Sequence, residues 1–285
     1  MTSKTIKHRH PAVRDDIADL TTRRPVPGVE IEQVDPFLFL NHHGPQVYPP
    51  RNRGLPFGPH PHRGFETVTF ILTGELAHRD SAGHESIIRE GGIQWMTAGS
   101  GLVHAEVSPD GFMRKGGPLE ILQLWVNLPP RLKMTTPRYI GLQQSDIPAI
   151  TTPDGKGTVH LTSGEYLGQQ GAMQPLLDIF LGTVELQAGG KVSFPGVKGR
   201  NVFLYVVRGE IAVAGADRKL EAVKALGAAA VINYKAPGAD IAAAVKEGSI
   251  GGVSIQKPYS VPCQRMNSSH MVVSGMPVLQ RISRS

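Results

Sequence analysis

The chain has very little cysteine: Cys263 is the only one among its 285 residues, so an internal disulfide is excluded. A single thiol is typical of proteins in reducing compartments, and it predicts a cytoplasmic location. The N-terminus lacks the apolar stretch of a signal peptide, and no apolar run approaches the length of a transmembrane helix. These absences predict a cytoplasmic protein without a membrane partner.

Charged residues are also scarce, at 19% of the chain, and they carry a net charge of +6 with a sequence pI of about 9.5. A basic balance of this kind occurs in proteins that bind nucleic acid or acidic partners. The basic residues are scattered, however, and no zinc-finger, helix-turn-helix or aromatic RNA-binding pattern accompanies them. A solvated basic surface is the preferred interpretation, and direct nucleic-acid binding is not predicted.

Glycine and proline are plentiful instead, with 33 and 23 residues, and apolar residues make up 40% of the chain. This composition favours many turns over long helices, and the length allows one large domain or two modest ones. Short segments rich in β-branched and aromatic residues alternate with turns, among them residues 65–73, 76–80 and 93–97. Such a meander of short strands predicts an all-β barrel or sandwich.

Two pairs of ligand-type residues flank this meander, His60 with His62 at its start and His104 with Glu106 at its end. Residues two apart project from the same face of a β-strand, so each extended pair directs both side chains one way. A stack of hairpins would bring the two faces together, and three imidazoles with one carboxylate suit a first-row transition metal. The same histidine spacing recurs in the basic N-terminal segment without strand residues around it, so the spacing by itself is weak evidence.

Two further histidines, His42 and His43, directly follow an apolar run over residues 37–40, which we expect to be buried. They would compete as ligands only if this strand reached the metal. The preferred interpretation is a hydrogen-bonded structural pair near the site.

Longer motifs surround the two ligand pairs. They are Pro59-His-Pro-His-Arg-Gly-Phe-Glu-Thr-Val-Thr69, His78-Arg-Asp-Ser-Ala-Gly83 and Trp95-Met-Thr-Ala-Gly-Ser-Gly-Leu-Val-His-Ala-Glu106. These motifs resemble those of the pirin family within the cupin superfamily, and the resemblance covers roughly residues 10 to 215. Pirins are bicupins with one mononuclear metal, usually iron, in the N-terminal barrel.

The resemblance implies that His60, His62, His104 and Glu106 are the four ligands of one divalent metal, with Fe(II) the expected ion. In many cupins the glutamate at the position of Glu66 is a ligand, whereas in pirins that role passes to the glutamate two places after the last histidine. Glu106 is therefore the preferred carboxylate ligand, and Glu66 is the alternative.

The second half of the chain repeats part of the first, which predicts a two-domain bicupin. A strand, a Gly-Glu turn and a strand over residues 202–215 parallel those over residues 68–78. When the two turns are aligned, Pro195 stands opposite His60, Val197 opposite His62 and Asn201 opposite Glu66. Pro and Val cannot replace imidazole donors, so the second copy is expected to be metal-free.

The expected organisation is a metal-binding cupin domain over residues 1–130, a linker over 131–153, a partial metal-free cupin domain over 154–216 and an atypical α/β-like segment over 217–285. Residues 217–235 are typical of a helix, a glycine cap and a short buried strand. They resemble a fragment of medium-chain alcohol dehydrogenases and quinone oxidoreductases, which predicts a chimeric or rearranged C-terminus. No Gly-rich turn precedes Asp217, so no NAD(P) site is predicted. The second barrel is expected to lack closing strands and to have an open edge.

For the metal site, the resemblance to pirins implies quercetin 2,3-dioxygenase activity, in which mononuclear iron and O2 cleave a small, flavonol-like aromatic substrate. Glu106 would act as a ligand, and Glu66 as the nearby carboxylate that takes the substrate's hydroxyl proton. The alternative is an iron-binding, redox-sensing regulator that binds a protein partner without turnover. A third interpretation is a cupin shell whose site is idle. Turnover on flavonols separates the enzyme from the others.

Overall fold

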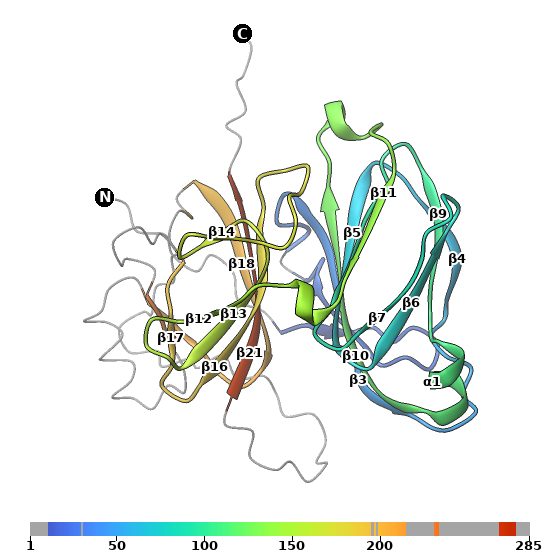
Figure 1. Cartoon of the computed structure of the whole chain (residues 1–285), viewed down its shortest axis with the longest axis horizontal. Helices are drawn as coiled ribbons and strands as arrows, with labels where there is room; N and C mark the ends of the chain where they lie inside the picture. The colour runs from blue at the N-terminus through green and yellow to red at the C-terminus, as the bar shows by residue number, and fades with distance from the viewer. Residues whose placement is uncertain are drawn as a thin grey trace. The chain divides into compact units, whose positions relative to one another are not determined.

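The computed structural model describes residues 11–29, 31–194, 197, 199–214, 231–233 and 268–277. These residues are mostly β-strand, and their α-helical part is the short helix α1 (Asp110–Lys115). The chain divides into two compact units between Ile147 and Pro148 (Figure 1). Within these residues, no helix has the length and apolar character needed to span a membrane.

The first unit contains two β-sheets, which Figure 1 shows as two layers with α1 at one end. A seven-stranded sheet has the order β1-β2-β3-β10-β5-β8-β11, and a four-stranded sheet has the order β4-β9-β6-β7. The strands are β1 (Val13–Arg14), β2 (Thr22–Val26), β3 (Phe37–Tyr48), β4 (Phe57–His62), β5 (Phe65–Thr73), β6 (Glu75–Asp80), β7 (Glu85–Arg89), β8 (Ile93–Thr97), β9 (Leu102–Val107), β10 (Gly117–Asn127) and β11 (Arg138–Leu142). The meander of short strands expected from the sequence is therefore present.

Strand β5 lies in the middle of the larger sheet, paired with β10 on one side and β8 on the other. Its central β-branched and aromatic residues, from Thr67 to Ile71, are buried on both faces. On one face Ile71 packs in a core cluster with Leu119 and Ile121 of β10. This packing holds β5 in register, and the register fixes which of its side chains face the candidate site.

Gly74 makes the turn from β5 to β6 possible. Its φ is +91°, in the left-handed region that side chains disfavour. A Cβ atom on this residue would lie 2.6 Å from the carbonyl oxygen of Pro118, closer than any real contact of this kind. The Gly-Glu turn recognised in the sequence therefore requires glycine for two separate reasons.

The segment over residues 131–153 was expected to be a linker, and the structure corrects that expectation. The prolines at 129 and 130 introduce only a short 3-10 turn, η1 (Pro130–Leu132), after which β11 pairs with β8. Tyr139 of β11 packs against the buried cluster that contains Met96 and Leu102, and this apolar contact keeps the segment in the first unit. The division between the units falls after Ile147.

The second unit has its own apolar core, which includes Val159, Leu161, Val184 and Phe194. Its largest sheet has the order β12-β13-β16-β21-β18, and a smaller one has the order β17-β20-β19. The strands are β12 (Ala149–Thr151), β13 (Gly157–Ser163), β14 (Glu165–Tyr166), β15 (Gln169–Gln170), β16 (Phe180–Gln187), β17 (Lys191–Val192), β18 (Arg200–Arg208), β19 (Ala212–Ala214), β20 (Val231–Asn233) and β21 (Ser268–Pro277). Strands β18 and β19 flank Gly209 as the internal repeat predicted.

Two strands come from the C-terminal segment that looked atypical in sequence. Strand β20 lies where the short strand was expected and pairs in parallel with β17 and β19. Strand β21, for which the sequence offered no pattern, lies between β16 and β18 and pairs antiparallel with both. The tail thus supplies a central strand of the larger sheet. The helix expected from Asp217 and the thiol of Cys263 lie outside the described residues.

Candidate metal centre

Three histidines of the first unit converge on one point. Strands β4 and β9 pair antiparallel with His60 opposite His104, and His62 follows two residues later on the same face of β4. The three ring centroids lie 4.5 to 4.9 Å apart. One ligand nitrogen of each ring lies within 4.8 Å of the others. We call these residues the histidine cluster.

The donor set of this cluster fits a transition metal. Nδ1 of His60 donates to the carbonyl oxygen of Gly58 at 2.7 Å, so Nε2 of His60 carries a lone pair. Nε2 of His60 and Nε2 of His104 lie 3.1 Å apart. Two nitrogens bound to one ion at right angles, with metal–nitrogen distances typical of zinc, would be about 3.0 Å apart. The spacing therefore matches that of two neighbouring ligands of one metal ion.

Burial keeps the imidazoles of His62 and His104 in the form that binds metal. Loss of hydration, and then the neighbouring rings His104 and His60, lower the pKa of His62 to about 4, although Glu106 opposes the shift. The pKa of His104 is lowered to about 3 by burial first and by His60 and His78 second. Both rings are therefore neutral at pH 7, and a neutral ring has a lone pair to donate.

Glu106 shares the face of the histidine cluster but is held by another residue. It follows His104 by two positions on β9 and is buried. Its Oε1 accepts a hydrogen bond of 2.6 Å from the hydroxyl of Thr69 on β5. Among the described residues, the group whose ligand atoms lie mutually within 4.8 Å consists of the three histidines. The role of Glu106 as a fourth ligand thus stays a prediction, from a carboxylate that is close to the cluster.

Glu66 lies on the other side of the larger sheet. Side chains alternate along β5, so Glu66 and Thr69 project from opposite faces, and Thr69 is the residue that faces Glu106. Oε1 of Glu66 accepts from the hydroxyl of Thr97 at 2.6 Å. Burial raises the pKa of Glu66, with Thr97 and the Trp95 indole opposing the shift. The structure does not bring Glu66 to the histidines, and this corrects its assignment as the alternative ligand or proton acceptor.

Three residues beside the cluster, His78, Asp80 and Tyr139, were not predicted from the sequence. His78 of β6 is buried, and its Nδ1 lies 3.5 Å from Nδ1 of His104. Nε2 of His78 contacts Oδ2 of Asp80 at 3.0 Å, and the ring stacks on Tyr139 with centroids 3.9 Å apart. His78 and Asp80 form another pair spaced by two on a strand. That spacing, the same as in the two ligand pairs, was the signal that could have found them.

The histidines of β3 behave as the sequence predicted. His42 is buried with Nε2 2.9 Å from Oε1 of Glu120, and His43 is buried with Nδ1 2.8 Å from the hydroxyl of Thr22. Their interpretation as a hydrogen-bonded structural pair is confirmed.

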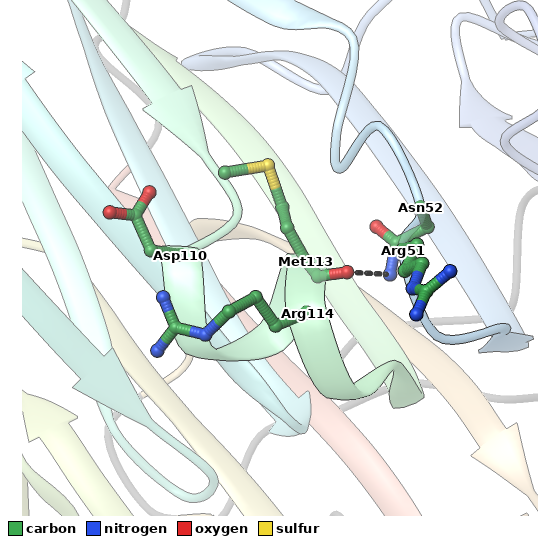
Figure 2. A pocket seen from close by; sticks show the side chains of 5 residues that line it. All are labelled: Arg51, Asn52, Asp110, Met113 and Arg114. Carbon is green, nitrogen blue, oxygen red and sulfur yellow. Dashed lines mark hydrogen bonds between the residues drawn. The ribbon is translucent and has the colours of Figure 1, made fainter.

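A surface hollow of about 300 Å3 lies beside α1 and contains none of the clustered histidines (Figure 2). It is lined by Arg51, Asn52, Asp110, Met113 and Arg114. Asn52 donates to the carbonyl oxygen of Met113, so the hollow lies where a loop packs against the end of α1.

Comparison with known proteins decides the family. The pirin family model matches residues 19–126. A putative quercetin 2,3-dioxygenase of Pseudomonas aeruginosa is 35% identical over 217 residues, which cover 74% of this chain and 73% of that protein. The chain belongs to the pirin family.

A second pirin relative and a solved structure extend the match. Another putative quercetin 2,3-dioxygenase of Pseudomonas aeruginosa is 41% identical over 182 residues, covering 64% of this chain and 64% of that protein. The chain thus spans less than two thirds of that relative's length. A crystal structure from Geobacillus kaustophilus aligns with 99% of this chain and 100% of its own, at 25% identity and a TM-score of 0.66. The all-β pirin bicupin fold predicted from the sequence is confirmed.

The second half of the pirin fold has different residues at the matching positions. Val197, which aligns with His62, is 4% exposed and packs in the apolar core of the second unit. Pro195 lies outside the described residues. The absence of metal from the second unit stays a prediction, and the burial of Val197 in the apolar core supports it.

Proposed function

We propose that this pirin is a metal-dependent dioxygenase of the quercetin 2,3-dioxygenase type, with the histidine cluster as its metal site. The observation that carries the proposal is the convergence of three imidazoles, with Nε2 of His60 and of His104 3.1 Å apart. The two Pseudomonas aeruginosa relatives named putative quercetin 2,3-dioxygenase give the proposed reaction class.

The proposed ligands are His60, His62 and His104, with Glu106 as the fourth. Three nitrogens and one carboxylate oxygen leave one or two positions open on a six-coordinate ion. A bound Fe(II) would supply the redox chemistry with O2, which zinc cannot supply. Glu106 would take this role from the face of β9 that it shares with His104, and Thr69 holds only its Oε1.

An aromatic wall next to the cluster supports a planar aromatic substrate. Trp125 of β10 lies 5.3 Å from His62 between ring centroids, and Phe65 lies 5.0 Å from it. Phe39 stacks on Trp125 at 4.5 Å. These three side chains are partly exposed. Partly exposed aromatic faces next to a metal site can stack on the rings of a flavonol and orient it.

The substrate hydroxyl must lose a proton as it binds, and a carboxylate of the chain is the expected acceptor. Glu106 is the carboxylate of choice, because it lies on the face of the histidines. Glu66 has the raised pKa of a proton acceptor but lies on the opposite face of β5. We therefore assign the proton to Glu106 in the proposed reaction.

The test is metal content together with oxygen uptake on quercetin in one purified sample. One iron per chain with substrate-dependent oxygen uptake supports the dioxygenase. His62→Ala is the matched variant, and it should lose both metal and oxygen uptake. Iron bound without turnover would reject the enzyme in favour of the alternative, an iron-binding regulator that recognises a protein partner. A soluble, folded protein without metal would overturn both.

A further inference from the structure

Two residues next to the histidine cluster, His78 and Asp80, have buried side chains that form a hydrogen-bonded chain ending at His104. Asp80 of β6 stands opposite His104 of β9, and His78 lies two residues before Asp80 on the same face. The chain runs from Oδ2 of Asp80 to Nε2 of His78, 3.0 Å, and from Nδ1 of His78 to Nδ1 of His104, 3.5 Å. The second contact is the longer one, at the limit of a hydrogen bond.

The contacts of Asp80 decide which groups donate and which accept along this hydrogen-bonded chain. Oδ1 of Asp80 accepts from the backbone N–H groups of Ala82 and His84, at 2.9 and 3.0 Å, and Nδ1 of His84 lies 2.9 Å from Oδ2. An oxygen that receives two backbone N–H groups is an acceptor, so these contacts make the Asp80 carboxylate the accepting end of the hydrogen-bonded chain.

An acceptor at Asp80 fixes the proton positions on both rings. Nε2 of His78 must carry its proton to donate to Asp80, so a neutral His78 presents the lone pair of Nδ1 to His104. His104 then donates from Nδ1, and its Nε2, which faces His60, keeps a lone pair for a metal. Tyr139 stacks on His78 at an interplanar angle of 9° and prevents the ring from turning.

We propose that His78 and Asp80 are positioning residues of the metal centre, which hold His104 in the tautomer whose Nε2 binds the ion. The inference rests on the metal-binding part of the proposed function and not on turnover. It gives His104 the same kind of partner that the carbonyl oxygen of Gly58 gives His60.

Asp80→Asn is the most informative variant, because it keeps the shape of the side chain and reverses the direction of hydrogen-bond donation between residue 80, His78 and His104. The amide oxygen takes the place of Oδ1 to satisfy the two backbone N–H groups, so the amide nitrogen faces Nε2 of His78 as a donor. His78 must then carry its proton on Nδ1, where it opposes the Nδ1 proton of His104. His78→Phe removes both hydrogen bonds of residue 78 and retains an aromatic ring that can stack on Tyr139.

Two measurements test the inference. Long-range 1H–15N NMR of the metal-free protein reports the tautomer of His104, assigned by the signal that disappears in His104→Gln. Chelator competition with Zn2+ reports the metal dissociation constant. We expect the Nδ1-protonated tautomer in the wild type, a shift toward the Nε2-protonated form in both variants, and a Zn2+ affinity about 10- to 100-fold weaker. His160→Gln, a histidine of β13 in the second unit, is the control and should change the dissociation constant less than twofold.

The outcomes separate the inference from the proposed function. An unchanged His104 tautomer in both variants overturns it, even where the metal affinity falls, because a packing defect also weakens binding. A wild type that binds no Zn2+ contradicts the proposed metal site, yet the tautomer in the metal-free protein still decides the role of His78 and Asp80. If His78→Phe does not fold, Asp80→Asn alone decides it.

Discussion

Thr69 of β5 and Glu106 of β9 join the two sheets of the first unit through one short hydrogen bond, 2.6 Å from the hydroxyl to Oε1. Both side chains are buried. The larger sheet thereby fixes the position of a carboxylate that belongs to the smaller one, beside the histidine cluster. Outer partners of metal ligands contribute to metal affinity because they orient the ligand. Thr69 is the residue of β5 that holds Glu106.

Thr69→Val tests this relationship, and the other face of β5 supplies the control. The substitution retains the shape and removes the hydroxyl, so Glu106 loses its partner. We expect Zn2+ affinity about 10-fold weaker and a free energy of unfolding lower by about 1–3 kcal/mol. Thr97→Val removes an equally short hydrogen bond, to Glu66. It should cost similar stability but change the Zn2+ dissociation constant less than twofold. Equal effects of the two variants on metal affinity would contradict the assignment of Glu106.

The aromatic wall predicts a separation of kinetic constants. Trp125→Ala removes the ring that lies between Phe39 and His62 and leaves the ligands in place. An aromatic pair contributes about 0.5–1.5 kcal/mol, so the KM for quercetin should rise about two- to tenfold. Metal content should remain at the wild-type level, and Trp125→Phe should recover most of the affinity. A normal KM in Trp125→Ala would show that the substrate does not stack on this wall.

The sequence predicted the parts of the fold and the site that follow from local pattern. Alternation along β4 and β9 was enough to place His60, His62 and His104 on one face, because strand geometry fixes it. Glu66 was wrongly expected at the metal site because the sequence does not show which face of β5 is turned toward it. The pairing of β5 turns Thr69 toward Glu106, and Glu66, three positions before Thr69, therefore projects from the opposite face.

Other features depended on pairing between distant segments, which the sequence does not display. β11 was mistaken for a linker because two prolines precede it, although its partner β8 retains it in the sheet. β21 has no visible pattern of its own and is defined by β16 and β18 on either side of it. His78 and Asp80 had the right spacing, but they contact the site only because their strand pairs with β9, which carries His104.

Buried His43 predicts a loss of stability in acid. Burial, and then His42 and Arg24, lower its pKa to about 3 from the ordinary 6.5. Between these two values the unfolded chain binds a proton that the folded chain excludes, so the free energy of unfolding falls as the pH drops below about 6.5. One such group contributes at most about 1.4 kcal/mol per pH unit. Urea unfolding at pH 7 and pH 5 should show a smaller difference for His43→Asn than for the wild type. Identical differences would mean that His43 is protonated in the folded protein.

The turn at Gly74 predicts two separable costs, because another glycine has the same backbone and different surroundings. Gly74 and Gly83 both have φ of +91°, but a Cβ on Gly83 would meet nothing within 4 Å, whereas one on Gly74 would lie 2.6 Å from the carbonyl oxygen of Pro118. Gly83→Ala should therefore lower the free energy of unfolding only by the backbone strain, about 1–3 kcal/mol. Gly74→Ala should lower it by more, because either the turn or the start of β10 must also move. Equilibrium urea unfolding of the two variants measures the difference. Equal losses would mean that the chain around Pro118 yields freely, and that the left-handed conformation alone makes glycine necessary at the β5–β6 turn.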